Sequence, residues 1–397
     1  MIGAIDHTSR EAKERSGERS YTCGVPLSRD EKRFVRLGAL LHDIGHVAAG
    51  HTVEDELCLI GKHDEDTRLD LLFTDKAWMD VRNRTLGALI DSEYNEFVPH
   101  DLVNQNVRAS DIVRLLIRKR SKSEDRYQRE QEVLESSDTL RFGICRDMIG
   151  NTICADLLDY LHRDWYHIGK PRPFDERILQ YMEIRPGTSA HNLDPKPAAT
   201  DQFVISLGKP SNPRTDAVSS ILELLEWRYQ LAESVLFHRT KLAAAAMLDR
   251  ALFDLWKDRS QDLERFLLPY SDEEMLVECR GEAEQLRGKK SVSDRERGDI
   301  ASKLLGALEK RQLFATLCSF MYHKLLPDVR EKIQTLYSKK PEGAQNLCPE
   351  NRSRALRQLE SDFALTPGSL AMYCPTKDMN RKIAEVKIAV GNSVSPF

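Results

Sequence analysis

The chain has 397 residues, of which 41% are hydrophobic and 31% charged, and its mean hydropathy is -0.49. This composition is typical of a water-soluble globular protein and excludes a chain that is disordered throughout. The 59 Lys and Arg residues nearly balance the 63 Asp and Glu residues, so the net charge of -4 provides no overall attraction to nucleic acid or anionic lipid.

Targeting and redox signals are weak. The first twenty residues contain eight charged side chains, which argues against the apolar core of a secretory signal. No segment approaches the roughly 20 apolar residues that a membrane span requires. The eight cysteines form no C-x-x-C pair, so we expect reduced thiols, a cytoplasmic location and no membrane partner.

The first 180 residues are expected to be mainly helical. The clearest helix runs from Arg29 to about Ile44, because Ser28 and Glu31 form a capping-box pattern and apolar residues recur at helical spacing until Gly45. Similar patterns predict further helices over residues 67–73, 86–92, 109–119 and 151–166.

The rest of the chain changes character several times. Residues 185–216 are rich in Pro, Gly, Ser and Asn and contain one predicted strand, 203–207. Helical spacing then follows over 221–247 and 300–325, with a predicted linker at 288–298, a loop at 338–352 and a strand at 382–390.

These patterns predict a mainly α fold that ends in a small α+β tail. Along the chain we expect three parts, namely a helical core (1–184), a loop and strand excursion with a substrate-facing helical region (185–285), and a helical extension with the tail (286–397).

Histidines cluster in one short segment, GALLHDIGHVAAGH, at residues 38–51. His42 and Asp43 are adjacent at the end of an apolar helix, where a carboxylate beside an imidazole is costly unless something pairs with it. His46 follows one turn later, and His51 comes after a run of small residues. This pattern favours a bound divalent cation.

The segment LLHDIGH, followed by a further His, resembles the signature of HD-domain phosphohydrolases, and the chain is similar within them to the deoxynucleoside triphosphate triphosphohydrolases. The resemblance implies an HD-type helical core and one metal ion held by a distant N-terminal His, the His-Asp pair and a later helical Asp. His7-Thr8 fits the first position, 35 residues before His42, and ICADLLDYLHRDWYHIG at residues 153–169 supplies Asp156. The expected metal ligands are therefore His7, His42, Asp43 and Asp156.

The same resemblance implies roles for other polar residues. His51, oriented by Glu54, is expected to act in proton transfer, and His46 to neutralise phosphate charge. Substrate contacts are expected from His63, Tyr160, Arg163, Asp164 and Arg228. Leu157, Ala232 and Leu236 replace polar or aromatic nucleotide contacts of the best-known enzymes, so the base and sugar are not predicted.

The function that this pattern favours is hydrolysis of a nucleoside triphosphate, with or without the 2'-hydroxyl, to nucleoside and triphosphate. The ligand set suits one divalent Mn, Fe, Co, Ni or Zn ion, and Mg can accompany the nucleotide. A homo-oligomer is expected by analogy.

Two alternatives stay open. One is another HD chemistry, namely a 5'-nucleotidase, a cyclic-nucleotide phosphodiesterase or a nuclease. A nucleic-acid partner is disfavoured because the only local basic excess lies at residues 108–129. The other alternative is a non-catalytic nucleotide-sensing protein.

Overall fold

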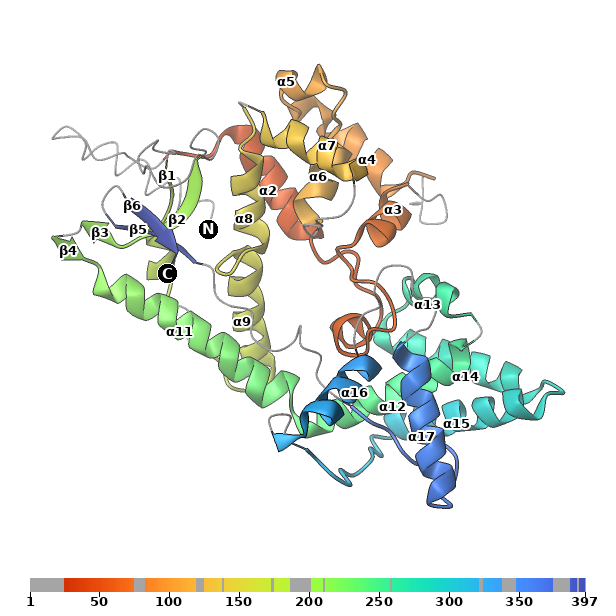
Figure 1. Cartoon of the computed structure of the whole chain (residues 1–397). Helices are drawn as coiled ribbons and strands as arrows, with labels where there is room; N and C mark the ends of the chain where they lie inside the picture. Colours follow the sequence, from red (N-terminus) through yellow and green to blue (C-terminus); the bar gives the residue numbers. More distant parts are fainter. Residues whose placement is uncertain are drawn as a thin grey trace. The chain divides into compact units, whose positions relative to one another are not determined.

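The computed structural model describes residues 25–74, 83–118, 125–137, 139–172, 175–185, 201–209, 211–257, 259–320, 324–337, 348–373, 386–390 and 393–396. Its fold is mainly α, as predicted. Contacts divide the chain into two units, each built from separated segments (Figure 1). The first comprises the described residues of Met1–Ile44, Leu69–Leu231 and Ile383–Phe397, and the second those of Gly45–Arg68 and Ala232–Lys382. The units are thus discontinuous, whereas the predicted three-part division follows chain order.

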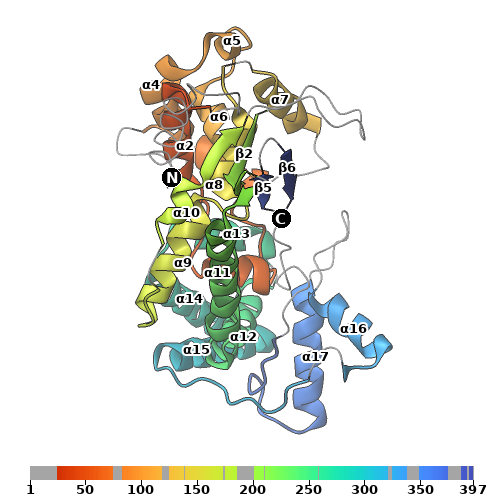
Figure 2. The ribbon, with the colours of Figure 1, turned by 90° about the vertical axis from the view of Figure 1, so that its left-hand side faces the viewer.

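The first unit packs helices against a small sheet. Its helices are α2 (Arg29–Leu41), most of α3 (Asp66–Thr74), α4 (Leu86–Tyr94), α5 (His100–Val103), α6 (Ala109–Ile117), α7 (Asp125–Glu135), α8 (Phe142–Gly150), α9 (Ala155–His167), α10 (Arg177–Gln180) and α11 (Thr215–Leu231), with a short 3-10 turn at Asn95–Phe97. Helix α2 contacts both α6 and α8, and α8 also contacts α9 and strand β2 (Figure 2). This packing sets α2 and α9, the helices that carry the predicted metal ligands, on a common scaffold.

Helix α2 begins as the sequence predicts. The Ser28 hydroxyl accepts from the backbone N–H of Glu31 at 3.1 Å, and the Glu31 carboxylate accepts from the backbone N–H of Ser28 at 2.7 Å, which completes the capping box. The helix ends at Leu41 with His42 as its C-cap, three residues before the predicted end. Because Ile44 is 36% exposed, the last apolar position of the predicted stripe does not extend the buried face.

A four-stranded sheet completes the first unit. Its strands lie in the order β1 (Met182–Arg185), β2 (Gln202–Ser206), β5 (Lys387–Val390) and β6 (Ser393–Pro396). Only the β2–β5 pair is parallel, and Ile205 lies opposite Met182 on one side and Ile388 on the other. A hairpin of β3 (Gly208–Lys209) and β4 (Asn212–Pro213) follows β2. The strands of the predicted α+β tail therefore complete this sheet within the first unit.

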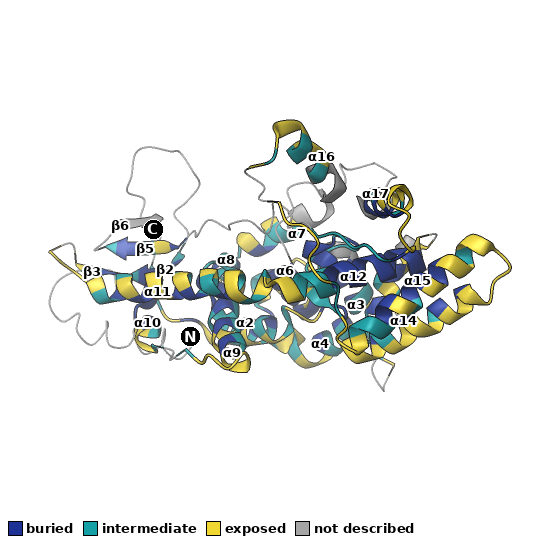
Figure 3. Ribbon diagram, turned by 90° about the horizontal axis from the view of Figure 1, so that it is seen from below, coloured by how far each residue is buried: buried dark blue, intermediate teal, exposed yellow. Residues whose placement is uncertain are grey.

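The second unit is a helical core around one almost wholly buried helix. It contains π-helical turns at Thr52–Glu56 and Ala232–Leu236 and helices α12 (Arg239–Trp256), α13 (Ser260–Leu267), α14 (Asp272–Arg287), α15 (Val292–Glu309), α16 (Pro327–Tyr337) and α17 (Cys348–Asp362). Every residue of α12 from Ala245 to Trp256 is buried, and α14 and α15 cover it (Figure 3). Buried ion pairs join α17 to α12, and one of them is Arg352 with Asp249 at 2.7 Å.

Two sequence predictions in this unit are wrong. The predicted linker 288–298 is helical from Val292, because Ser291 caps α15 by accepting from the backbone N–H of Asp294. The predicted helix 300–325 ends at Glu309, and residues 312–320 adopt no regular structure. Of the predicted loop 338–352, residues 348–352 belong to α17 and 338–347 lie outside the described residues.

Two absences hold for the described residues. None of the helices there combines the length and apolar character that a bilayer crossing requires. The cysteines at 58, 145, 154, 279 and 318 are free thiols. Burial raises the thiol pKa of Cys279 to about 12 and also raises that of Cys145. These buried thiols are therefore unreactive, as the predicted structural role requires.

We expect Glu31→Gln to lower the free energy of unfolding by about 1.5–3 kcal/mol. The Glu31 side chain is 1% exposed and accepts from Arg141 Nε at 2.7 Å and Nη2 at 2.6 Å, so an amide would leave the partly buried guanidinium with Asp201 Oδ2, 3.2 Å from Nη1, as its acidic partner among the described residues. Chemical denaturation measures the change. The matched control is Asp30→Asn, since Asp30 is 43% exposed and, within the described part of the chain, pairs with the partly exposed Arg33, so its cost should stay below about 1 kcal/mol. Equal losses in both variants would contradict the assignment.

Candidate metal centres

Three predicted metal ligands come together in the first unit. His42 Nε2 lies 3.3 Å from Asp43 Oδ2 and 3.2 Å from Asp156 Oδ1, although 114 residues separate His42 from Asp156. Helix α2 presents the pair at its C-terminal end, and α9 presents Asp156 in its first turn. The side chains are 25%, 55% and 39% exposed respectively, so solvent reaches the cluster.

These separations match those between neighbouring ligands of one cation. Ligand bonds of about 2.1 Å place adjacent donors about 3.0 Å apart at right angles and about 3.4 Å apart at tetrahedral angles. The observed 3.2 and 3.3 Å fall in this interval. The donor set of one imidazole and two carboxylates is also one that divalent transition metals accept.

The tautomer of His42 also bears on whether a cation binds to this cluster. Its Nδ1–H donates to the backbone carbonyl of Ala39 at 2.8 Å, so the neutral ring points the lone pair of Nε2 at two carboxylate oxygens. That arrangement is repulsive unless Nε2 holds a proton or a cation lies between the three groups. In the absence of a cation, Asp156 and then Asp43 raise the pKa of His42 to about 10.

Helix α9 orients the remaining predicted residues of this unit. Leu157, Leu161 and Trp165 are buried, and Asp156, Tyr160 and Asp164, which recur every four residues beside them, are partly buried. Burial raises the pKa of Tyr160 to about 12, against the effect of the nearby Arg228 guanidinium, and burial also raises the pKa of Asp164. The charges of Arg228 and Asp156 both act on Tyr160, and the substrate-binding roles of Tyr160, Asp164 and Arg228 stay predictions.

Arg163 lies differently. Its guanidinium pairs with Asp159 one turn earlier on α9, and both side chains are more than half exposed. A solvent-exposed pair of this kind is worth little to stability. The substrate-binding role of Arg163 stays a prediction.

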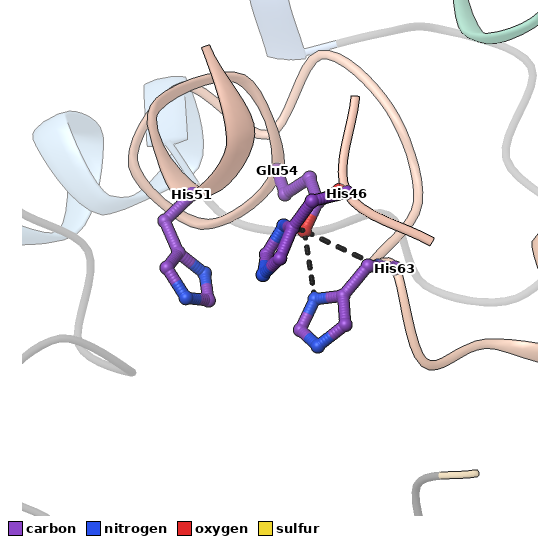
Figure 4. Close-up of side chains that lie close together, drawn as sticks. All are labelled: His46, His51, Glu54 and His63. Carbon is purple, nitrogen blue, oxygen red and sulfur yellow. Dashed lines mark hydrogen bonds and ion pairs between the residues drawn. The ribbon is translucent and has the colours of Figure 1, made fainter. Parts of the chain in front are cut away.

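A second cluster lies in the second unit and contains His46, His51, Glu54 and His63 (Figure 4). The rings of His46 and His63 lie 3.8 Å apart between centroids, and those of His46 and His51 lie 4.5 Å apart. One donor atom from each of the four residues falls within 4.8 Å of the others. Among the described residues, this cluster and the His42 cluster are the two groups whose donors could hold a metal ion.

Glu54 organises this second cluster from a fully buried position. Its Oε1 accepts from Arg68 Nη1 at 2.8 Å, and its Oε2 lies 3.0 Å from His63 Nδ1 and 3.4 Å from His46 Nδ1. Burial alone would raise the pKa of Glu54, but the His46, His63 and Arg68 interactions hold it well below its ordinary range. The carboxylate is thus ionised and anchored.

Our prediction that Glu54 orients His51 is wrong. His51 Nδ1 lies 2.8 Å from Asp55 Oδ2, and Glu54 faces the other two rings. His51 is the N-cap of the π-helical turn at Thr52–Glu56, and its acidic partner lies four residues further along the chain. Sequence reasoning missed Asp55 and Arg68: Asp55 follows His51 by four residues and could have been found by helical spacing, whereas nothing in the sequence singles out Arg68.

His7 lies outside the described residues, so the fourth predicted ligand is not placed.

Comparisons with known proteins add little. The sequence matches no protein-family model and none of the curated proteins. Among solved structures, one match is the crystal structure of a phosphohydrolase from Bacteroides thetaiotaomicron, with a TM-score of 0.48 and 14% identity over 100% of this chain and 79% of that chain. Similarity at this level assigns neither a family nor an activity.

We expect His42 to stay protonated through neutral pH in protein stripped of divalent cations, since its pKa is raised from 6.5 to about 10. Because the folded value is the higher one, the stability that the proton contributes is complete below about pH 6.5 and is lost as pH rises through about 10. NMR titration of the imidazole resonances measures this, with His42→Gln identifying the signal. Asp156→Asn should lower the pKa by about 1 to 3. A wild-type ring that titrates near its ordinary value would contradict the geometry.

Proposed function

We propose that this chain is a metal-dependent phosphohydrolase whose metal is held by His42, Asp43 and Asp156, with His7 as a fourth ligand. The observation that carries the proposal is the Nε2 atom of His42 facing two carboxylate oxygens at 3.2 and 3.3 Å while its Nδ1–H is engaged by a backbone carbonyl. A carbonyl on the outer nitrogen is a common support for a metal-binding His, because it fixes the tautomer and the direction of the lone pair.

Different residues of the chain take different roles in the proposed hydrolase. A divalent ion, when bound, supplies an acidified water molecule and polarises a phosphate. Asp43 and Asp156 would balance the positive charge of the ion. Because both side chains are partly exposed, a phosphate oxygen can also reach the ion. Tyr160 is within electrostatic range of both Asp156 and Arg228, so a hydroxyl and a cation are available to position an anionic substrate.

We extend the proposal to a nucleoside triphosphate as substrate and to nucleoside and triphosphate as products. The support is the resemblance of the motif, together with the Tyr160, Asp164 and Arg228 side chains around the α9 cluster. Proton transfer by His51 and phosphate contacts from His46 and His63 belong to the same proposal, with Asp55 in place of Glu54 as the residue that holds His51. A homo-oligomer is part of it as well.

Asp156→Asn should abolish stable binding of Mn2+ at the His42 cluster and lower phosphohydrolase activity by at least about a hundredfold, because the amide oxygen is a far weaker ligand than a carboxylate. Isothermal titration calorimetry and a turnover assay measure the two effects. Asp159→Asn is the matched control on the same helix, since Asp159 is 60% exposed and, among the described residues, pairs with Arg163. Full turnover in a metal-stripped Asp156→Asn protein would refute the ligand assignment.

A panel of NTPs and dNTPs, with product analysis, tests the reaction. We expect release of inorganic triphosphate and nucleoside in the presence of Mn2+, Co2+ or Zn2+. Monophosphate or orthophosphate as the product would replace the proposed reaction with another phosphohydrolase chemistry. Binding of nucleotide with thermal stabilisation, but without turnover under any metal, would point to a sensing protein.

A further inference from the structure

The second cluster has the donors of a metal site in its own right. His46, His51 and His63 supply imidazole nitrogens and Glu54 supplies a carboxylate oxygen, all within 4.8 Å of one another. Three imidazoles with one carboxylate form a set that Zn2+ and related ions bind in four-coordinate sites. The four residues belong to one unit, Gly45–Arg68 with Ala232–Lys382, so the cluster forms without any residue of the His42 cluster.

The Glu54 carboxylate is arranged like a metal ligand. Arg68 occupies Oε1 at 2.8 Å and leaves Oε2 to face the imidazoles. The distances from Oε2 to His63 Nδ1 and His46 Nδ1 are 3.0 and 3.4 Å, which equal the spacing of adjacent ligands around an ion with bonds of about 2.1 Å. Arg68 also donates to the backbone carbonyls of Gly45 and Gly61, so the support of Glu54 is rigid.

The backbone is shaped to bring these rings together. Gly45 packs so closely on the next segment that a Cβ there would lie 2.3 Å from the carbonyl oxygen of His63, which only glycine permits. Ala49 adopts a left-handed φ of 62°, a conformation that costs free energy in a residue with a Cβ. The π-helical turn at Thr52–Glu56 then sets His51 and Glu54 on the same side as His46 (Figure 4).

From these observations we infer that His46, His51, His63 and Glu54 bind a second transition-metal ion of the zinc class, with Asp55 as a positioning residue. Asp55 Oδ2 holds His51 Nδ1 at 2.8 Å, so His51 offers its Nε2 to the ion. His51 is 63% exposed and His46 and His63 are 21% and 14% exposed, so the ion has a path from solvent.

The competing interpretation is a cluster of imidazoles that is merely hydrogen-bonded. Such a cluster would keep no ion once excess metal is removed, whereas the proposed site would retain one ion per chain. The inference replaces the proton-transfer role proposed for His51 and the phosphate contacts proposed for His46 and His63. It does not depend on the reaction, because metal content is measured without substrate.

The test is metal content of the full chain, loaded with Zn2+ or Co2+ and freed of excess ion. In Asp156→Asn protein, which lacks a ligand of the His42 cluster, we expect one ion per chain to remain, and in the His51→Ala/His63→Ala variant of that protein we expect none. The remaining Co2+ should show the strong visible absorption of a four-coordinate site, and X-ray absorption at the zinc edge should show imidazole scattering. His100→Ala, which changes an exposed histidine outside both clusters, is the matched control and should retain the ion.

A variant with a smaller structural change distinguishes loss of metal binding from loss of folding. Asp55→Asn should weaken Zn2+ binding about 10- to 100-fold in the Asp156→Asn background, with unchanged circular dichroism, because the amide no longer fixes the tautomer of His51. His51→Ala alone should weaken binding further, and its exposure makes a loss of folding unexpected. The inference would be overturned if Asp156→Asn protein bound no ion. It would also be overturned if the affinity for the ion were the same in the Asp55→Asn variant as in the His51→Ala variant. Failure here leaves the phosphohydrolase proposal intact, since that depends on the metal at Asp156.

Discussion

One imidazole nitrogen decides how the first unit is interpreted. His42 Nε2 faces Asp43 and Asp156, and the outer nitrogen of the same ring is already engaged by the carbonyl of Ala39. A protein that needed only stability would gain little from a half-exposed cluster of this kind, since exposed ion pairs contribute less than about 1 kcal/mol. Two distant segments therefore converge on one ring and form a group whose donors could hold a metal ion.

The second unit also contains closely spaced charged side chains, but some of them are buried. There the acidic group, Glu54, is fully buried, and Arg68 pairs with it from an equally buried position. Removing either partner would leave a charge in an apolar surrounding, which costs several kcal/mol. His46 and His63 consequently face a fixed carboxylate, whereas Asp43 and Asp156 are 55% and 39% exposed.

Local rules in the sequence predicted much of this arrangement. The capping box of Ser28 and Glu31 located helix α2, because it depends on contacts within a few residues, whereas Asp156 was singled out by the resemblance of residues 153–169 to a known family. The partner of His51 was predicted wrongly, because Glu54 and Asp55, three and four residues after His51, both lie within reach of the ring on helical spacing. Long-range pairing was also out of reach: the parallel β2–β5 pair and the Arg68 contact join segments that no periodicity relates.

The two donor sets differ in chemistry, and this difference bears on what each could do. One imidazole with two carboxylates is oxygen-rich and favours harder ions such as Mn2+, which tolerate six ligands and exchange water readily. Three imidazoles with one carboxylate are nitrogen-rich and favour Zn2+ in a four-coordinate site. Three residues separate His42 from His46 along the chain. The first histidine of one donor set therefore lies about one helical turn before the first histidine of the other. Selection between ions thus follows from which side chains the segment directs to Asp156 and which it directs to Glu54.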